Sequence, residues 1–226
     1  SGPSFERLPP TLRARFGLLA AHAALSVDNL HRAYRLLERV EAEAPSNSAR
    51  YEATFLRARV HHHSGKFEAA LSLYKTLEAE GHRPIRARAT LARVELMLDL
   101  GRISRQDAIE KLESLRHVWR GDSFEQELLH RLGDLYQEER DYMNALSALR
   151  DATDVFPGEA TKTAMQGEMQ KMFAALFIEG GADQLSPLAA LGLYYEFGEL
   201  APKGEAGAQI VEGLANRLVD VELLDR

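Results

Sequence analysis

The densest group of residues able to do chemistry is the run His61, His62 and His63. Imidazoles bind metal ions or transfer protons. Adjacent residues of a helix are about 100° apart, so histidines converge on one ion only at spacings of three or four. No other His, Asp or Glu lies three or four residues from any of the three. We therefore expect one packed and two solvated histidines near a helix end, without a metal site or a catalytic role.

The rest of the sequence carries no catalytic signature. It lacks the G-x-S-x-G, H-E-x-x-H and calcium-loop motifs. The glycine pair at Gly180 and Gly181 has no phosphate-loop pattern around it. The absence of cysteine excludes disulfides, thiol catalysis and cysteine–metal sites. The sequence therefore predicts no enzyme, no cofactor and no metal, because any activity would need a site that no motif announces.

The elements that could position a binding site repeat along the chain. Small residues recur at steps of 37, 38 and 37 positions, at Ala33, Ala70, Ala108 and Ala145. Each alanine follows a helical run and a short polar break, and it begins a second apolar helical run. A fixed period of this size is typical of stacked helical repeats, which usually bind partners on an extended surface.

The clearest unit spans residues 126–159. It carries Leu132, Gly133, Tyr136, Ala145 and Pro157 at the spacing of W-x2-L-G-x2-Y, A-x3-F and P, and so resembles the tetratricopeptide repeat. Leu129 and Leu149 stand where the family has Trp and Phe. The resemblance implies an all-α, right-handed α-solenoid of about eleven helices. We expect four TPR-like helical hairpins over residues 11–159, and a divergent helical C-terminal region over 160–226 that continues and caps the solenoid.

Composition and charge narrow the class of partner. The 226 residues are 45% hydrophobic and 27% charged, and no apolar run approaches the length of a transmembrane helix. Residues 1–84 hold 12 Lys and Arg against 9 Asp and Glu, a net charge of +3, and residues 85–226 hold 16 against 25, a net charge of −9. The dispersed arginines and the overall charge of −6 argue against nucleic acid. No membrane insertion is expected.

The chain begins with Ser-Gly-Pro rather than Met, and its last residues lie inside an amphipathic run. We expect it to be a piece of a longer protein. The Ala, Arg and Leu usage favours a bacterial source, and the compartment is left open because a cysteine-free chain is tolerated in either redox setting.

In tetratricopeptide arrays the first helix of each pair lines a concave groove. Alignment on the repeated alanines places ten candidate groove residues there: Arg15, Leu18, His22, Phe55, Arg59, His62, Arg93, Met97, His130 and Gln137. Arginines from three units would face one channel, beside apolar pockets at Leu18, Phe55 and Met97. Guanidinium groups bind carboxylates bidentately, so an extended, partly acidic peptide is the expected ligand. The alternative is that the arginines pair with Glu52 and Glu127 of the array itself.

The leading hypothesis is thus a non-catalytic scaffold that binds another protein or peptide. Repeats that bind chaperone tails have Lys and Asn where this chain has Leu18 and His22, so that subtype is not expected. Two alternatives are a substrate-presenting domain of a larger enzyme and a self-association module. The second would form a homodimer through the C-terminal helices, if the apolar face of the last helix were exposed at Ile210, Leu214, Leu218 and Val221.

Overall fold

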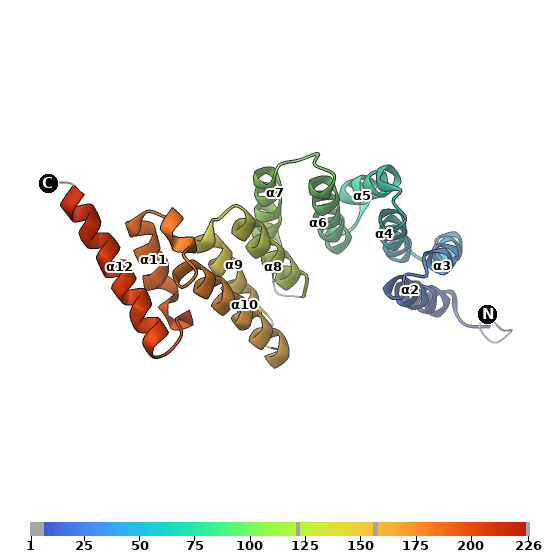
Figure 1. Ribbon diagram of the computed structural model, residues 1–226. Coiled ribbons are helices and arrows are strands. Elements are labelled where there is room, and N and C mark those ends of the chain that lie inside the picture. Colours follow the sequence, from blue (N-terminus) through green and yellow to red (C-terminus); the bar gives the residue numbers. More distant parts are fainter. Residues whose placement is uncertain (1–6, 121–122, 156–157, 225–226) are drawn as a thin grey trace. The chain divides into compact units, whose positions relative to one another are not determined.

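The chain forms helices throughout the part that the computed structural model describes, which is residues 7–120, 123–155 and 158–224 (Figure 1). These residues contain eleven α-helices, two short 3-10 helices and no strand. The α-helices are α2 (Pro10–Ser26), α3 (Leu30–Glu43), α4 (Asn47–His63), α5 (Phe67–Glu80), α6 (Arg83–Asp99), α7 (Arg105–Val118), α8 (Ser123–Glu138), α9 (Tyr142–Val155), α10 (Glu159–Phe177), α11 (Pro187–Phe197) and α12 (Glu205–Leu224). The predicted all-α repeat architecture is confirmed. Pro157 of the repeat pattern lies outside the described residues.

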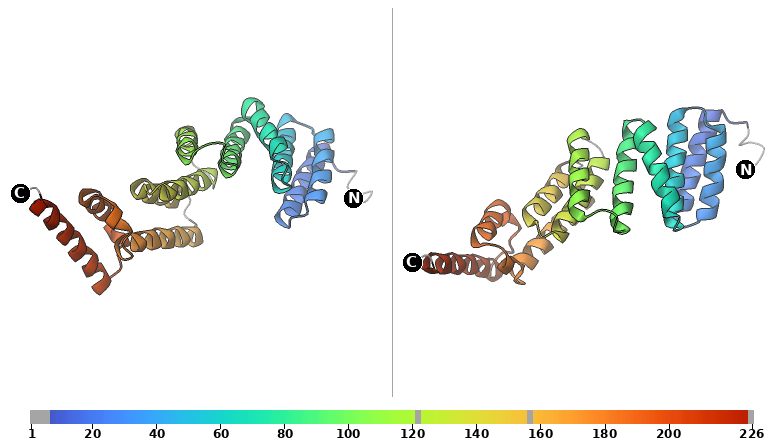
Figure 2. Two further views of the ribbon diagram at one scale, coloured as in Figure 1. Left: turned by 45° about the horizontal axis from the view of Figure 1, so that its top comes forward. Right: turned by 90° about the horizontal axis from the view of Figure 1, so that it is seen from above.

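The chain divides into two compact units, unit 1 (residues 1–115) and unit 2 (residues 116–226), and each is described by itself. In unit 1 the hairpins α2–α3 and α4–α5 pack in sequence, and α6 packs on α5. The two further views in Figure 2 show α2 and α3 lying side by side. In unit 2 the hairpin α8–α9 is followed by α10, which packs on α9. The predicted boundary between 159 and 160 stays a prediction, because these units are defined by packing and not by repeat pattern.

One turn geometry recurs in the four links α2–α3, α4–α5, α6–α7 and α8–α9. A single residue adopts left-handed backbone, with φ of 54°, 73°, 65° and 61° at Asp28, Gly65, Gly101 and Arg140. The amide of the next residue donates to the carbonyl five positions before it, in the pairs Asn29–Ala24, Lys66–His61, Arg102–Met97 and Asp141–Tyr136, at 2.8–2.9 Å. This is the bond of the Schellman helix ending, which satisfies a carbonyl at the end of the first helix. The repeat is therefore visible in backbone geometry as well as in sequence.

The repeated alanines mark the close contacts within this fold. Ala33, Ala70, Ala108 and Ala145 have no exposed surface. In the α8–α9 hairpin a Cβ atom added at Gly133 would lie 2.9 Å from Cγ of Leu149. Small residues are needed here because the helices approach too closely for larger ones.

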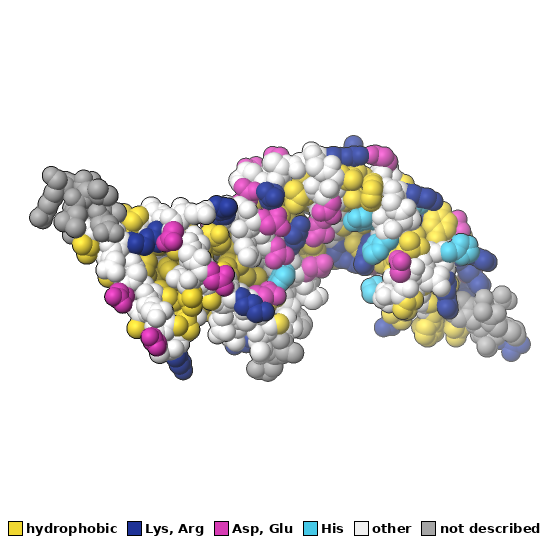
Figure 3. Space-filling view, viewed as in Figure 1, with side chains coloured by type: hydrophobic (Ala, Val, Ile, Leu, Met, Phe, Trp, Pro, Cys, Tyr) yellow, Lys and Arg dark blue, Asp and Glu magenta, His cyan; other side chains and the backbone are white. Residues whose placement is uncertain are grey.

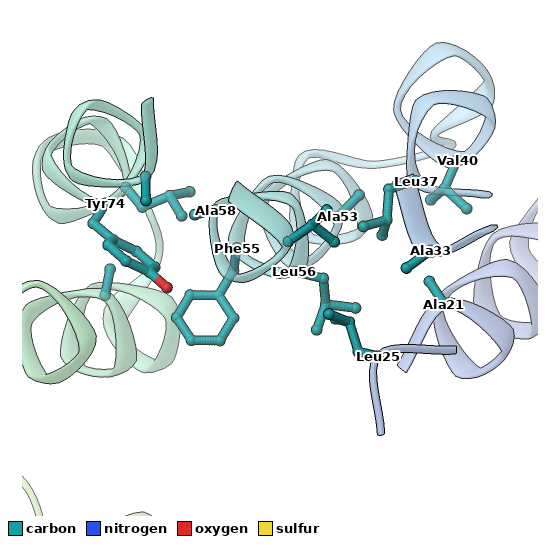
Figure 4. Packing of buried hydrophobic residues seen from close by; sticks show 14 of the residues in the cluster. Ala21, Leu25, Ala33, Leu37, Val40, Ala53, Phe55, Leu56, Ala58 and Tyr74 are labelled. Atoms are coloured by element: carbon teal, nitrogen blue, oxygen red, sulfur yellow. The ribbon is translucent and has the colours of Figure 1, made fainter. Parts of the chain in front are cut away.

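Each unit has its own core. Ala and Leu from α2, α3 and α4 pack in unit 1 together with Phe55 and Tyr74 (Figure 4). In unit 2 methionine and aromatic residues of the C-terminal region form the core, with Met169, Met172, Phe173 and Phe197 buried.

The last helix differs from its prediction. Ile210 and Leu214 are 3% and 6% exposed, so they are core residues and not an open dimer face. They pack in the same cluster as α10 and α11, which covers this side of α12. Leu218 is partly buried, and the side chain of Val221 lies outside the described residues. Across the described residues, no helix combines the length and the apolar character needed to cross a membrane.

Candidate peptide-binding face

The best-defined face of unit 1 is built by α4 and α6. Glu52 accepts two hydrogen bonds from Nη1 of Arg88, at 2.7 Å and 3.0 Å. The guanidinium carbon of Arg88 lies 4.3 Å from the centroid of the Phe55 ring. Arg59 is seven residues after Glu52, almost two helical turns, so the two share one face of α4. We call this surface the α4 face, defined by Glu52, Phe55, Arg59, His62 and Arg88.

Arg59 is the cation of this face that has no counter-ion. It is half-buried, and no carboxylate of the described residues lies within ion-pair distance of it. His62 lies one turn further along, and burial is the main cause that lowers its pKa, followed by the charge of His63 and, among lesser causes, that of Arg59. A half-buried guanidinium without a carboxylate is a ready site for a ligand carboxylate.

The neighbouring helix α2 extends the row. Arg15 and Leu18 precede Glu52 and Phe55 by 37 residues each, which is the repeat length. Arg15 is exposed and makes no ion pair with the described residues, Leu18 is half-buried against the core, and His22 is exposed. These three side chains are accessible to a ligand.

Phe55 differs from the expectation of an apolar pocket. Only 5% of its surface is exposed, because the ring packs 5.9 Å from the ring of Tyr74 and lies under Arg88. Figure 4 shows Phe55 reaching from α4 toward Tyr74 of α5. Phe55 therefore forms the floor of the face and offers no open pocket.

Arg93 and Met97 lie at a second place, beside α5. Nε of Arg93 donates to Oε1 of Glu78 at 2.8 Å, and Nη1 lies 3.3 Å from Sδ of Met97. Both line an open hollow of about 340 Å³ with Leu71 and Lys75. Arg93 is five residues from Arg88, which turns it by roughly 140° around α6. The predicted single row of Arg15, Arg59 and Arg93 is therefore not what the structure places together.

Sequence reasoning missed Arg88, which the structure brings to the face. Helix α6 starts 36 residues after α4, at Arg83 against Asn47, whereas α7 starts 38 residues after α5, at Arg105 against Phe67. The repeated alanines lie in the second helix of each pair. Alignment on them therefore shifts the residues of α6 by two positions relative to those of α4. Counting from the helix start that Pro84 marks would have found Arg88.

Two predicted residues lie on α8 in unit 2. Nε2 of His130 is 2.9 Å from Oε2 of Glu168 on α10, and Nδ1 is 3.6 Å from Asp134. Burial is the main cause that raises the pKa of Asp134. Gln137 is exposed and lines an open hollow of about 360 Å³ with Arg131, Asp134 and Glu138. Within the described residues, no cluster of three or more His, Asp or Glu could hold a metal ion.

The alternative, in which the predicted groove arginines pair with glutamates of the repeats themselves, agrees with the structure only in part. Glu52 is paired, but its partner is Arg88 and none of the predicted arginines. Arg93 is paired with Glu78. Glu127 is exposed and forms no ion pair with the described residues. Arg15 and Arg59 thus keep their charges available.

Comparison with solved structures places this arrangement among tetratricopeptide-repeat folds. A Podosopora anserina protein with nearly identical TPR-like repeats is 16% identical, with a TM-score of 0.54, and the match covers 96% of this chain and 99% of that one. A thermophilic TPR protein from Thermus thermophilus is 19% identical, with a TM-score of 0.55 and coverage of 91% and 99%. No family model matches the sequence, and no curated protein matches it. The chain therefore has the tetratricopeptide-repeat fold, a solenoid of helical hairpins.

Proposed function

We propose that this chain is a non-catalytic protein-interaction scaffold whose α4 face, together with α2, binds an extended, partly acidic peptide segment. The observation that carries the proposal is the half-buried Arg59, which has no carboxylate partner among the described residues and stands beside an arginine that has one. The neighbouring helix α2 offers the exposed Arg15 and the half-buried Leu18.

The neighbouring pair explains why Arg59 is the selective group. Arg88 is held by two hydrogen bonds to Glu52 and by the Phe55 ring, so it stiffens the face without being free to bind. An incoming Asp or Glu side chain can instead form a bidentate pair with Arg59, in a site partly shielded from water. Apolar ligand side chains next to that carboxylate would contact Leu18.

A direct test is selection of random displayed peptides on the whole chain, followed by fluorescence anisotropy of the selected peptides. We expect peptides rich in Asp and Glu. Arg59→Glu should weaken their binding by about tenfold or more, because it replaces an attraction by a repulsion in a shielded place. Arg35→Glu makes the same change of charge at an exposed position of α3, and it serves as the matched control.

Equal binding by wild type and Arg59→Glu would show that the α4 face is not the site. The alternative that the repeats present substrate to a catalytic region elsewhere stays a prediction, as does the bacterial source.

A further inference from the structure

The outer side of α2 carries an apolar line that no other described helix covers. Leu12, Phe16 and Leu19 are 39%, 50% and 60% exposed. Their spacings of four and three residues put them on one face of the helix. The opposite side of α2 is buried, at Ala14 and Ala21. We call the line of Leu12, Phe16 and Leu19 the α2 stripe.

A cavity opens beside the α2 stripe, between α2 and α3. Its volume is about 190 Å³, and its apolar wall is formed by Phe16, Ala20, Leu36 and Val40. Arg13 and Arg39 stand at its rim, and both pair with Glu43, at 3.6 Å and 3.1 Å. Nε of Arg13 is buried and has no hydrogen-bond partner in the described part of the chain. The cavity therefore combines an apolar interior with a rim of two cations and one anion.

Unit 2 carries a matching line on α11. Leu188, Leu191 and Tyr195 are 75%, 38% and 90% exposed. They also span seven residues, so each line is about 10 Å long at 1.5 Å per residue. Hydrophobic side chains reach the surface over this part of unit 2 in Figure 3. We call Leu188, Leu191 and Tyr195 the α11 stripe.

The charges of the two units are opposite. Unit 1 has 18 Lys and Arg against 14 Asp and Glu, a net charge of +4, and unit 2 has 10 against 20, a net charge of −10. Helix α2 itself carries Arg13 and Arg15 and no acidic residue. Opposite electrostatic potentials attract unit 1 of one copy to unit 2 of another. Like charges disfavour the pairing of two copies of unit 1 or of two copies of unit 2.

We propose that the α2 stripe and its cavity bind the α11 stripe of a second copy of this chain. The lines agree in length, both are apolar, and the units that carry them are opposite in charge. A leucine or tyrosine side chain of the α11 stripe would enter the cavity. The contact joins two different surfaces, so it is head-to-tail and can add further copies.

The test is sedimentation velocity on the whole chain over a wide range of concentration and at two salt concentrations. Wild type should associate increasingly with concentration, and less at high salt because the unit charges are screened. Phe16→Asp and Tyr195→Asp should each lower the association constant by about tenfold or more, since each puts a charge into the apolar contact. Ile178→Asp, at an apolar residue 51% exposed and outside both stripes, is the matched control and should associate like wild type. Circular dichroism melting checks that each variant is folded.

An equimolar mixture of Phe16→Asp and Tyr195→Asp gives the sharpest result. The first variant keeps an intact α11 stripe and the second keeps an intact α2 stripe, so the mixture should form a one-to-one dimer and nothing larger. A wild type that stays monomeric would overturn the proposal. So would a Phe16→Asp chain that associates like wild type, because the α2 stripe would then not be part of the contact. Arg59→Glu lies outside the α2 stripe and should weaken the association much less than Phe16→Asp does, which keeps this outcome separate from that of the peptide experiment.

Discussion

Tyr74 gives the most quantitative test of the core of unit 1. Its side chain has no exposed surface, and its hydroxyl has no hydrogen-bond partner in the described residues. Figure 4 shows the hydroxyl between α5 and the Phe55 ring. Burial raises the pKa of Tyr74 to about 12, and the charges of Arg59 and Glu95 change it less, in opposite directions.

The raised pKa makes folding depend on pH in alkaline solution. The unfolded chain releases this proton near pH 10, whereas the folded chain keeps it to about pH 12. Between these values the unfolded state binds fewer protons, so the free energy of unfolding falls as pH rises. Tyr74 therefore contributes its full stability below pH 10, and the loss through this window is about 2–3 kcal/mol, at 1.36 kcal/mol per pKa unit.

Tyr74→Phe removes the hydroxyl and keeps the ring. An unsatisfied buried polar group costs roughly 1–3 kcal/mol, so the variant should be at least as stable as wild type near pH 8. Its advantage should widen as pH rises above 10, because it has no proton to lose there. Urea unfolding followed by circular dichroism at several pH values measures both effects. Tyr195→Phe, at a residue 90% exposed, is the control and should follow wild type.

Two outcomes would refute this reasoning. A Tyr74→Phe chain clearly less stable than wild type near pH 8 would mean that the hydroxyl makes a favourable hydrogen bond. An unchanged alkaline loss of stability in Tyr74→Phe would mean that other groups cause it.

Four further substitutions test separate features of the fold. Ala145→Leu should lower the free energy of unfolding by roughly 1–3 kcal/mol, since the site has no exposed surface and would be overpacked; an unchanged urea midpoint would contradict the close crossing. Gly65→Ala should lower the free energy of unfolding by about 1 kcal/mol and Asp28→Gly should raise it by about 1 kcal/mol, because both positions have left-handed backbone. Urea unfolding measures both changes. Changes of the same sign would argue against this turn. Arg59→Glu should leave the melting temperature nearly unchanged, because Arg59 forms no ion pair with the described residues that the substitution would break. A large drop would make Arg59 structural.

The sequence predicts the helices of this chain well because their determinants are local. Ala70 and Ala145 mark close crossings, and the breaks between helices carry turn residues such as Gly65. The left-handed residues Asp28 and Arg140 were not visible in the same way, because neither residue type adopts that backbone as readily as glycine does. Their conformation is imposed by the packing of the hairpin and by the amide–carbonyl bond that closes each turn.

The site was harder to predict because side-chain partners depend on the offset between neighbouring helices. Alignment on the repeated alanines places Thr90 of α6 opposite Glu52. The helices of the structure are offset by two residues from that alignment, so Arg88 is opposite Glu52 instead. The burial of the apolar face of the last helix could not be predicted from the sequence either. Whether Ile210 is buried depends on α10 and α11, whose apolar sides cover it and whose packing no repeat pattern specifies.

The two proposed surfaces share α2, so salt alone cannot separate them. Leu12, Phe16 and Leu19 lie on average about a quarter turn around α2 from Arg15, Leu18 and His22, at 100° per residue. A peptide on the α4 face and a second copy on the α2 stripe would thus approach one helix from different sides, and high salt would weaken both. Substitution can separate them, because Phe16 lines the cavity and Arg59 does not. If Phe16→Asp abolished peptide binding and self-association together, both would have to use one surface, and the acidic unit of a second copy would become the ligand of the α4 face.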